Sequence, residues 1–440
     1  MATTILQKGS KKLLNAWAFY DWANSVYSLV IASAVFPLFY GALFRMADVE
    51  KVIVFGVEIS RTPLISYVTA LAFICIAIVT PLVSGIADYL GNKKLFLKFF
   101  CYLGALSCIG LYWFSLENIY FGLICYFLAL VGFWVSFAVN NSYLPDVAFP
   151  EQQDAISSKG FSYGYIGSVI LLLFNLSMVM YPNFYGFTSE IGNPAEMKAM
   201  RVSFVTVGIW WAFFSQYSFK YMPKGNKREG ERKNIILNGF RELLSVWQQL
   251  GEQTKLKKYL RAFFVYSMAV QTIMLIAAYF GEEEIQWGTD SERTTGLIVS
   301  ILLIQLVAII GATLTAKASK HYGNIKTLVV INIFWVFLCV YAYFVQTPNG
   351  FYFAAGLVGL VMGGIQALSR STYSKFLPET TDTTSFFSFY DSAEKIGIVI
   401  GMLVYGIVTQ KMESARPATL ILAVFFIVGA FLLTRVNKKP

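Results

Sequence analysis

Apolar runs of about 20 residues, twelve of them separated by polar segments, dominate this chain of 440 residues. A helix of that length matches the hydrocarbon core of a bilayer. Only 14% of the residues are charged, against about 25% in a typical soluble domain, which argues against a soluble enzyme or a disordered protein. We therefore predict an all-α polytopic membrane protein. The predicted spans are roughly 17–44, 63–84, 95–115, 118–140, 160–181, 201–221, 261–281, 294–316, 325–346, 350–372, 386–410 and 416–435.

The distribution of basic residues predicts the orientation of these spans. With the amino terminus inside, alternate connections place 27 Lys and Arg residues on the cytoplasmic side and 8 outside. Without the central segment the ratio is still 16 to 8, and such an excess is the usual cytoplasmic signal. We attribute the net charge of +10 to topology rather than to nucleic acid as a partner. Both termini are expected in the cytoplasm and the loop 182–200 outside.

One long polar segment, 222–260, divides the spans into six and six. Within it Phe240, Leu244 and Trp247 recur at helical spacing, which predicts an amphipathic helix on the membrane surface. The predicted organisation is a cytoplasmic leader (1–16), an amino-terminal six-helix bundle (17–221), a cytoplasmic linker (222–260), a carboxy-terminal six-helix bundle (261–435) and a cytoplasmic tail (436–440).

Three short repeats indicate that the two halves are related by duplication. Their offset is about 232 residues, and each lies at an equivalent place in its half. They are GNKK at 91–94 with GNIK at 323–326, LPD at 144–146 with LPE at 377–379, and IG at 166–167 with IG at 396–397. Parallel repeats of six helices predict a transporter whose two bundles move about a central site.

The segment after the second span resembles a superfamily signature. Residues 84–94 read SGIADYLGNKK. This segment is similar to the loop motif of the major facilitator superfamily at Asp88, Gly91 and Lys93, and it departs from that motif at Ser84, Tyr89 and Asn92. Three further segments are similar to the vacuolar-effluxer-like branch, whose fungal members export amino acids from the vacuole during autophagy. They are WAFYDWANS at 17–25, GIQALSRS at 364–371 and FFSFYD at 386–391.

This resemblance implies a major facilitator fold and a secondary active transporter of a small polar organic solute. Amino-acid efflux by alternating access is the expected activity, in a bacterial member that lies as a monomer among the lipids of the inner membrane. An exporter of lipid-like or drug-like amphiphiles is one alternative, and a non-transporting membrane receptor or scaffold is another.

No enzyme motif accompanies these features. The chain has a single histidine, His321, so a histidine-based triad or a multi-histidine metal site is excluded, and it has no Gly-rich phosphate loop. We predict no catalytic residues, no metal site and no cofactor.

Polar residues within the spans are the candidate substrate path, because a charge inside a bilayer is costly and normally faces a partner or a cavity. Asp21, Asn24 and Ser28 fall on one face of the first span. The other candidates for the substrate path are Asn140, Asn141, Gln271 and Gln366.

Charged residues at the cytoplasmic ends of the spans are the candidate inner gate. Arg370, Asp391, Glu394 and Lys395 are expected to meet Asp21, Asn140 and Asn141 at one depth, where ion pairs hold the bundles together until that side opens. Arg370 is predicted to pair with at least one of Asp21, Asp391 and Glu394.

Two further roles are assigned to acidic residues. The superfamily resemblance places Asp88 near the amino-terminal end of the eleventh span, where free backbone N–H groups favour a negative charge. Because Lys320 occupies the corresponding position in the second half, only the first loop is expected to form this latch. Asp21 is the candidate for proton coupling, provided that Arg370 is not its partner; uncoupled facilitated diffusion is the alternative.

Overall fold

The computed structural model describes residues 6–49, 51–190, 194–225, 235–380, 382–412 and 414–436. Parts of the predicted leader (1–5), linker (226–234) and tail (437–440) lie outside the described residues.

The first half is built from long helices joined by short turns. Its first span is composite: α1 (Lys11–Val26) continues through a π-helix (Tyr27–Val35) into α2 (Phe36–Met46). The other long helices are α3 (Arg61–Leu90), α4 (Lys93–Gly110), α5 (Ile119–Ser142), α7 (Pro150–Met180) and α8 (Ala195–Tyr221). The connections contain the antiparallel hairpin of β1 (Lys51–Val54) and β2 (Val57–Ser60), α6 (Leu144–Val147), and 3-10 turns at Leu111–Trp113 and Pro182–Tyr185.

The second half repeats this arrangement after an intervening helix, α9 (Ile235–Glu252). Its long helices are α10 (Thr254–Glu284), α11 (Asp290–Tyr322), α12 (Asn324–Phe344), α13 (Pro348–Phe376), α14 (Thr383–Met412) and α15 (Arg416–Thr434). Helix α9 lies in the predicted amphipathic segment and contacts α3 of the first half as well as α10 and α14 of the second. Its Trp247 packs on Phe389, with ring centroids 5.4 Å apart.

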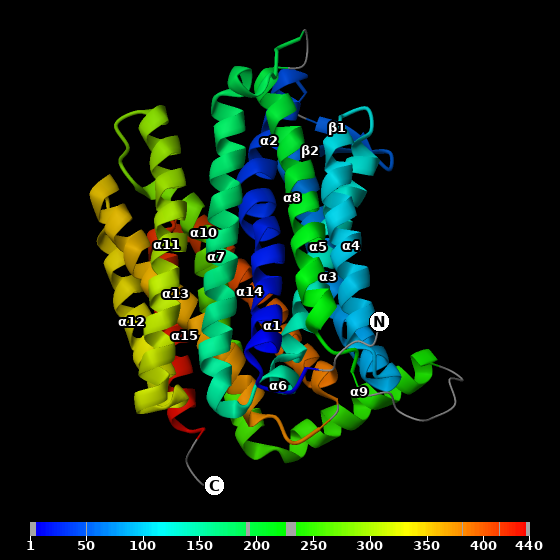
Figure 1. The fold of residues 1–440 in the computed structure, drawn as a ribbon. Helices are drawn as coiled ribbons and strands as arrows, with labels where there is room; N and C mark the ends of the chain where they lie inside the picture. Colours follow the sequence, from blue (N-terminus) through cyan, green and yellow to red (C-terminus); the bar gives the residue numbers. More distant parts are fainter. Residues whose placement is uncertain are drawn as a thin grey trace.

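Eleven helical segments among the described residues are long and apolar enough to cross a membrane. The twelfth predicted span corresponds to α8, whose two tryptophans and polar residues such as Ser215 and Gln216 lower its mean hydropathy. Helix α8 packs against α1 and α4 along their length (Figure 1). The predicted fold, twelve transmembrane helices in two six-helix bundles, is confirmed.

The two ends of the helical bundle differ in the structural elements that lie there. We call the end where α1 begins and α15 ends the terminal side, and the end that carries the β1–β2 strands the hairpin side (Figure 1). Helix α9 lies across the terminal side (Figure 1). Each half has its own main apolar core, which includes Trp17 and Trp211 in the first half and Trp335 and Phe426 in the second. Separate cores allow each half to move as a unit.

An ion pair fastens the second half on its hairpin side. Glu284, at the end of α10, accepts a hydrogen bond from Nε of Arg416 at 2.7 Å and from the backbone N–H of Ala415 at 2.6 Å. Burial raises the pKa of the Glu284 carboxyl, but these bonds and one from Ser414 outweigh that effect and hold the pKa below its ordinary value. The charged form of Glu284 therefore ties α10 to α15.

Candidate functional site

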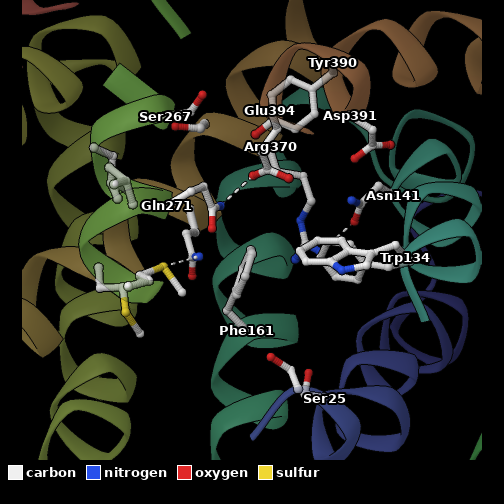
Figure 2. A pocket seen from close by; sticks show the side chains of 18 of the residues that line it. Ser25, Trp134, Asn141, Phe161, Ser267, Gln271, Arg370, Tyr390, Asp391 and Glu394 are labelled. Atoms are coloured by element: carbon white, nitrogen blue, oxygen red, sulfur yellow. Dashed lines mark hydrogen bonds between the residues drawn. The ribbon is translucent and has the colours of Figure 1, made fainter. Parts of the chain in front are cut away.

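A cavity lies between the two halves, and both halves line it. The first half contributes residues of α1, the π-helix, α5 and α7, and the second half contributes residues of α10, α11, α13 and α14 (Figure 2). Its volume of about 150 Å³ is roughly ten times what one water molecule needs. The space is therefore sufficient for a small organic solute.

Arg370 lines this cavity and joins the two halves. It lies on α13, is 1% exposed, and donates to Asp21 Oδ2 of α1 from both terminal nitrogens at 3.2 Å. It also donates to Asn141 Oδ1 at 2.9 Å and to the Oγ and carbonyl oxygen of Ser157 at 2.9 and 3.0 Å. A guanidinium has five N–H donors, and these five bonds use all of them. The predicted pairing of Arg370 with Asp21 is present.

Aromatic rings and a glycine shape the surroundings of this ion pair. The guanidinium carbon lies 4.6 Å from the ring centroid of Trp17 and 4.3 Å from that of Phe161, so the charge is held between two π-faces. Gly160 of α7 lies against the same pair, because a Cβ there would be 2.4 Å from Asp21 Oδ2. The close approach of α1 and α7 at this level therefore requires glycine.

The carboxylates of α14 lie on the cavity wall instead of joining the halves. Glu394 accepts a hydrogen bond from Nε2 of Gln271 at 2.7 Å (Figure 2). It also pairs with Lys395 Nζ at 2.6 Å. Both partners belong to the same half as Glu394. The prediction that Glu394 forms a gate contact between the halves is therefore wrong for this structure. Lys395 reaches the first half by another route, since its Nζ lies 3.4 Å from the ring centroid of Trp134.

Asp391, one turn before Glu394, also lines the cavity and is 4% exposed. Its Oδ2 has no hydrogen-bond partner, and the nearest cations, Arg370 and Lys395, are ion-paired with Asp21 and Glu394. The expectation that Asp391 forms a gate ion pair is therefore also corrected. In Figure 2 a dashed line joins Gln271 to Glu394, and none reaches the carboxylate of Asp391.

The predicted substrate-path residues divide into two groups. Ser28, Asn141, Gln271 and Gln366 line the cavity, and Gln366 accepts a hydrogen bond from the Tyr165 hydroxyl at 2.9 Å across the halves.

Asp21, Asn24 and Asn140 instead lie behind the cavity wall and are at most 2% exposed. Asn140 supports the ion pair, since its backbone oxygen accepts from Trp17 Nε1 at 2.8 Å. Because α1 turns its polar stripe partly toward its own bundle, the stripe is not one continuous solute path.

The condition for Asp21 as the proton carrier also fails, because Arg370 is its partner.

A first junction on the terminal side joins the end of α3 to the start of α14. Asp88 accepts hydrogen bonds from the backbone N–H groups of Ser385 at 2.7 Å and Thr384 at 3.4 Å, the free donors of a helix amino terminus. Lys93 donates to Thr383 and to Asp146 Oδ2, the latter at 2.7 Å. The position predicted for Asp88 is thus observed.

A second junction, which the sequence did not predict, lies at the pseudo-equivalent place. Asp154, near the start of α7, pairs with Lys375 Nζ at 2.6 Å and accepts from Asn324 Nδ2 at 2.9 Å and Ser319 Oγ at 3.1 Å. The expectation that only the first loop forms a latch is therefore wrong. In the second junction the acidic residue lies on α7 of the first half and not in the repeated loop of the second half. Comparing the two loop sequences could therefore not identify it.

A metal site requires several ligand side chains that lie close together. Within the described residues, no three or more His, Cys, Asp or Glu side chains are grouped closely enough to hold a metal ion.

Two six-helix halves around a cavity lined by polar and apolar side chains, joined on one side by ion pairs, define a membrane transporter of the major facilitator type. The chain belongs to the family described as "Vacuole effluxer Atg22 like", which it matches over residues 9–439. It is accordingly a transporter and not an enzyme.

Relatives of this chain carry transporter and effluxer names. It is 29% identical over 435 residues to the "Uncharacterized MFS-type transporter YxiO" of Bacillus subtilis (strain 168), covering 99% of this chain and 97% of that protein. It is 26% identical over 404 residues to "Autophagy-related protein 22" of Saccharomyces cerevisiae (strain ATCC 204508 / S288c), covering 80% and 73%.

Solved structures of low identity share the fold. The transporter FucP in its outward conformation superimposes with a TM-score of 0.72 at 16% identity, covering 97% of this chain and 99% of that one. A bacterial homologue of the iron transporter ferroportin in an outward-facing state gives 0.65 at 10% identity, with the same coverage.

Proposed function

We propose that this protein is a secondary transporter that exports a small polar organic solute, specifically an amino acid, by alternating access. The observation that carries the proposal is the cavity between the halves, which combines carboxylates, amides and aromatic rings. An amino acid presents charged and apolar groups together, so a wall of this mixed character suits it. The effluxer name of the family supports the same direction.

The junctions on the terminal side supply one of the two states that alternating access needs. Asp21–Arg370, Asp88–Ser385 and Asp154–Lys375 all join the halves near the ends of their helices. Opening this side would break these contacts and expose the groups to water, so that the cavity could admit a solute from there. The cavity lies within one chain, and a monomer is sufficient for this cycle.

We also propose that the terminal side faces the cytoplasm in a bacterial inner membrane. Single cysteines in a variant lacking the five native ones test this orientation. Asn183→Cys, exposed on the hairpin side, is expected to react with a membrane-impermeant maleimide in intact cells. Gln248→Cys, exposed on α9, is expected to react only after permeabilisation. The reverse labelling pattern would overturn the topology.

Counterflow in proteoliposomes tests the transport activity. Vesicles loaded with unlabelled leucine are expected to take up radiolabelled leucine faster than vesicles that contain no protein, because exchange needs no driving gradient. Uptake of lipid-like or drug-like amphiphiles in place of amino acids would favour the alternative exporter. Absence of exchange for every solute class by a correctly folded protein would contradict a transport function.

A further inference from the structure

The acidic and basic side chains around the cavity do not match in number. Arg370 is matched by Asp21, and Glu394 is matched by Lys395, each pair within hydrogen-bond distance. Asp391 is left over, so among these two cations and three acids no cation is free to match Asp391 in its charged form. A buried carboxylate without a counterion is costly, so it either takes up a proton or is matched by a cation. The cavity that Asp391 lines is the place from which such a cation can come.

The position of Asp391 allows a solute to supply that counterion. Its carboxylate belongs to the cavity wall, its Oδ2 has no hydrogen-bond partner, and the residue is 4% exposed. Tyr390 and Phe137 line the same cavity, so its wall also has aromatic surface for the apolar part of a solute.

We propose that Asp391 binds the positively charged nitrogen of the transported solute, so that an ammonium group is the part of the solute that the cavity requires. This inference rests on the proposed function and narrows its substrate class. Arg370 does not serve as the complementary site for a carboxylate in this state, because its five donors are already used. Gln271 Nε2 has a second N–H besides the one that it donates to Glu394, and this N–H is left for the other end of the solute.

Two fragments of leucine separate the roles of its charged groups. Isoamylamine retains the ammonium and lacks the carboxylate, whereas isocaproate retains the carboxylate and lacks the ammonium. We expect isoamylamine to raise the melting temperature of the purified full-length protein and to compete with radiolabelled leucine, because a bound ligand stabilises the folded state. Isocaproate is expected to do neither. Competition by isocaproate without competition by isoamylamine would overturn the proposal.

Variants connect this selectivity to Asp391. Asp391→Asn is expected to weaken binding of isoamylamine by about 10- to 100-fold, the loss typical of a charge-assisted hydrogen bond. Asp391→Glu keeps the charge and is expected to recover part of the affinity. Glu58→Gln removes a carboxylate from the exposed hairpin, where its side chain is 66% exposed, and is expected to bind isoamylamine as the unmodified protein does.

The outcomes distinguish this proposal from the proposed function. Leucine counterflow that persists with unchanged affinity in Asp391→Asn would remove the ammonium site and leave amino-acid transport standing. Binding of isoamylamine that depends on Asp391, without leucine counterflow, would remove amino-acid transport and leave the ammonium site. If Asp391→Asn does not fold, the fragment competition in the unmodified protein and the Asp391→Glu variant still decide the question.

Discussion

Replacement of Arg370 by alanine is expected to lower transport by at least about tenfold while the protein is still inserted in the membrane. Arg370 and Asp21 have side chains that are each 2% exposed, and removal of one partner leaves a buried charge unpaired, at a cost of about 3–5 kcal/mol. The loss falls on the state in which the terminal side is closed, because Asp21 gains water when that side opens. Counterflow and the melting temperature of the purified protein measure the two effects.

A double variant separates loss of the gate from general damage. Asp21→Asn combined with Arg370→Gln removes both charges, so no isolated buried charge remains, and the melting temperature is expected to recover toward that of the unmodified protein. Transport is expected to stay low, because the charge pair that closes the terminal side is still missing. Near-normal counterflow by Arg370→Ala would contradict the gating role of this residue.

The fold could be predicted because a bilayer constrains length and hydropathy more strongly than water does. The sequence located α8 as a span even though its tryptophans and polar residues lower its hydropathy. The first and last residues of the helices were harder to predict from the sequence. Helix α7 begins at Pro150, ten residues before the predicted span, because its first turns carry polar side chains that pair with the second half and leave no apolar signal.

The part of the candidate site that could be predicted consists of charged residues that must find a partner because they lie inside the membrane. Arg370 and Asp21 are charges within apolar spans, and the sequence indicated that each needs a partner. The pairing of Glu394 with Lys395 was not predictable, since adjacent residues on a helix normally point to different faces. Only the three-dimensional structure shows that Glu394 lies on the cavity wall beside Gln271 and that Lys395 packs on Trp134.

Asp154→Asn is expected to shift the conformational equilibrium toward the state that is open on the terminal side. The substitution keeps the shape of the side chain but removes the ion pair with Lys375 and weakens the bonds from Asn324 and Ser319. Hydrogen bonds to charged groups contribute about 1.5–3 kcal/mol, so the ratio of open to closed molecules is expected to rise by about 10- to 100-fold. Distances between spin labels on the terminal ends of α7 and α13 measure this ratio.

Two comparisons make the result specific to the junctions. Glu151→Gln lies on the same helix, is exposed, and is expected to leave the distance distribution unchanged. Asp88→Asn weakens the first junction in the same way, since it removes the charge that accepts from Ser385 and Thr384. One junction joins α3 to α14 and the other joins α7 to α13. Because both restrain the same movement of the halves, the double variant is expected to shift the equilibrium further than either single one. A distance distribution in Asp154→Asn identical to that of the unmodified protein would show that the second junction does not hold this side closed.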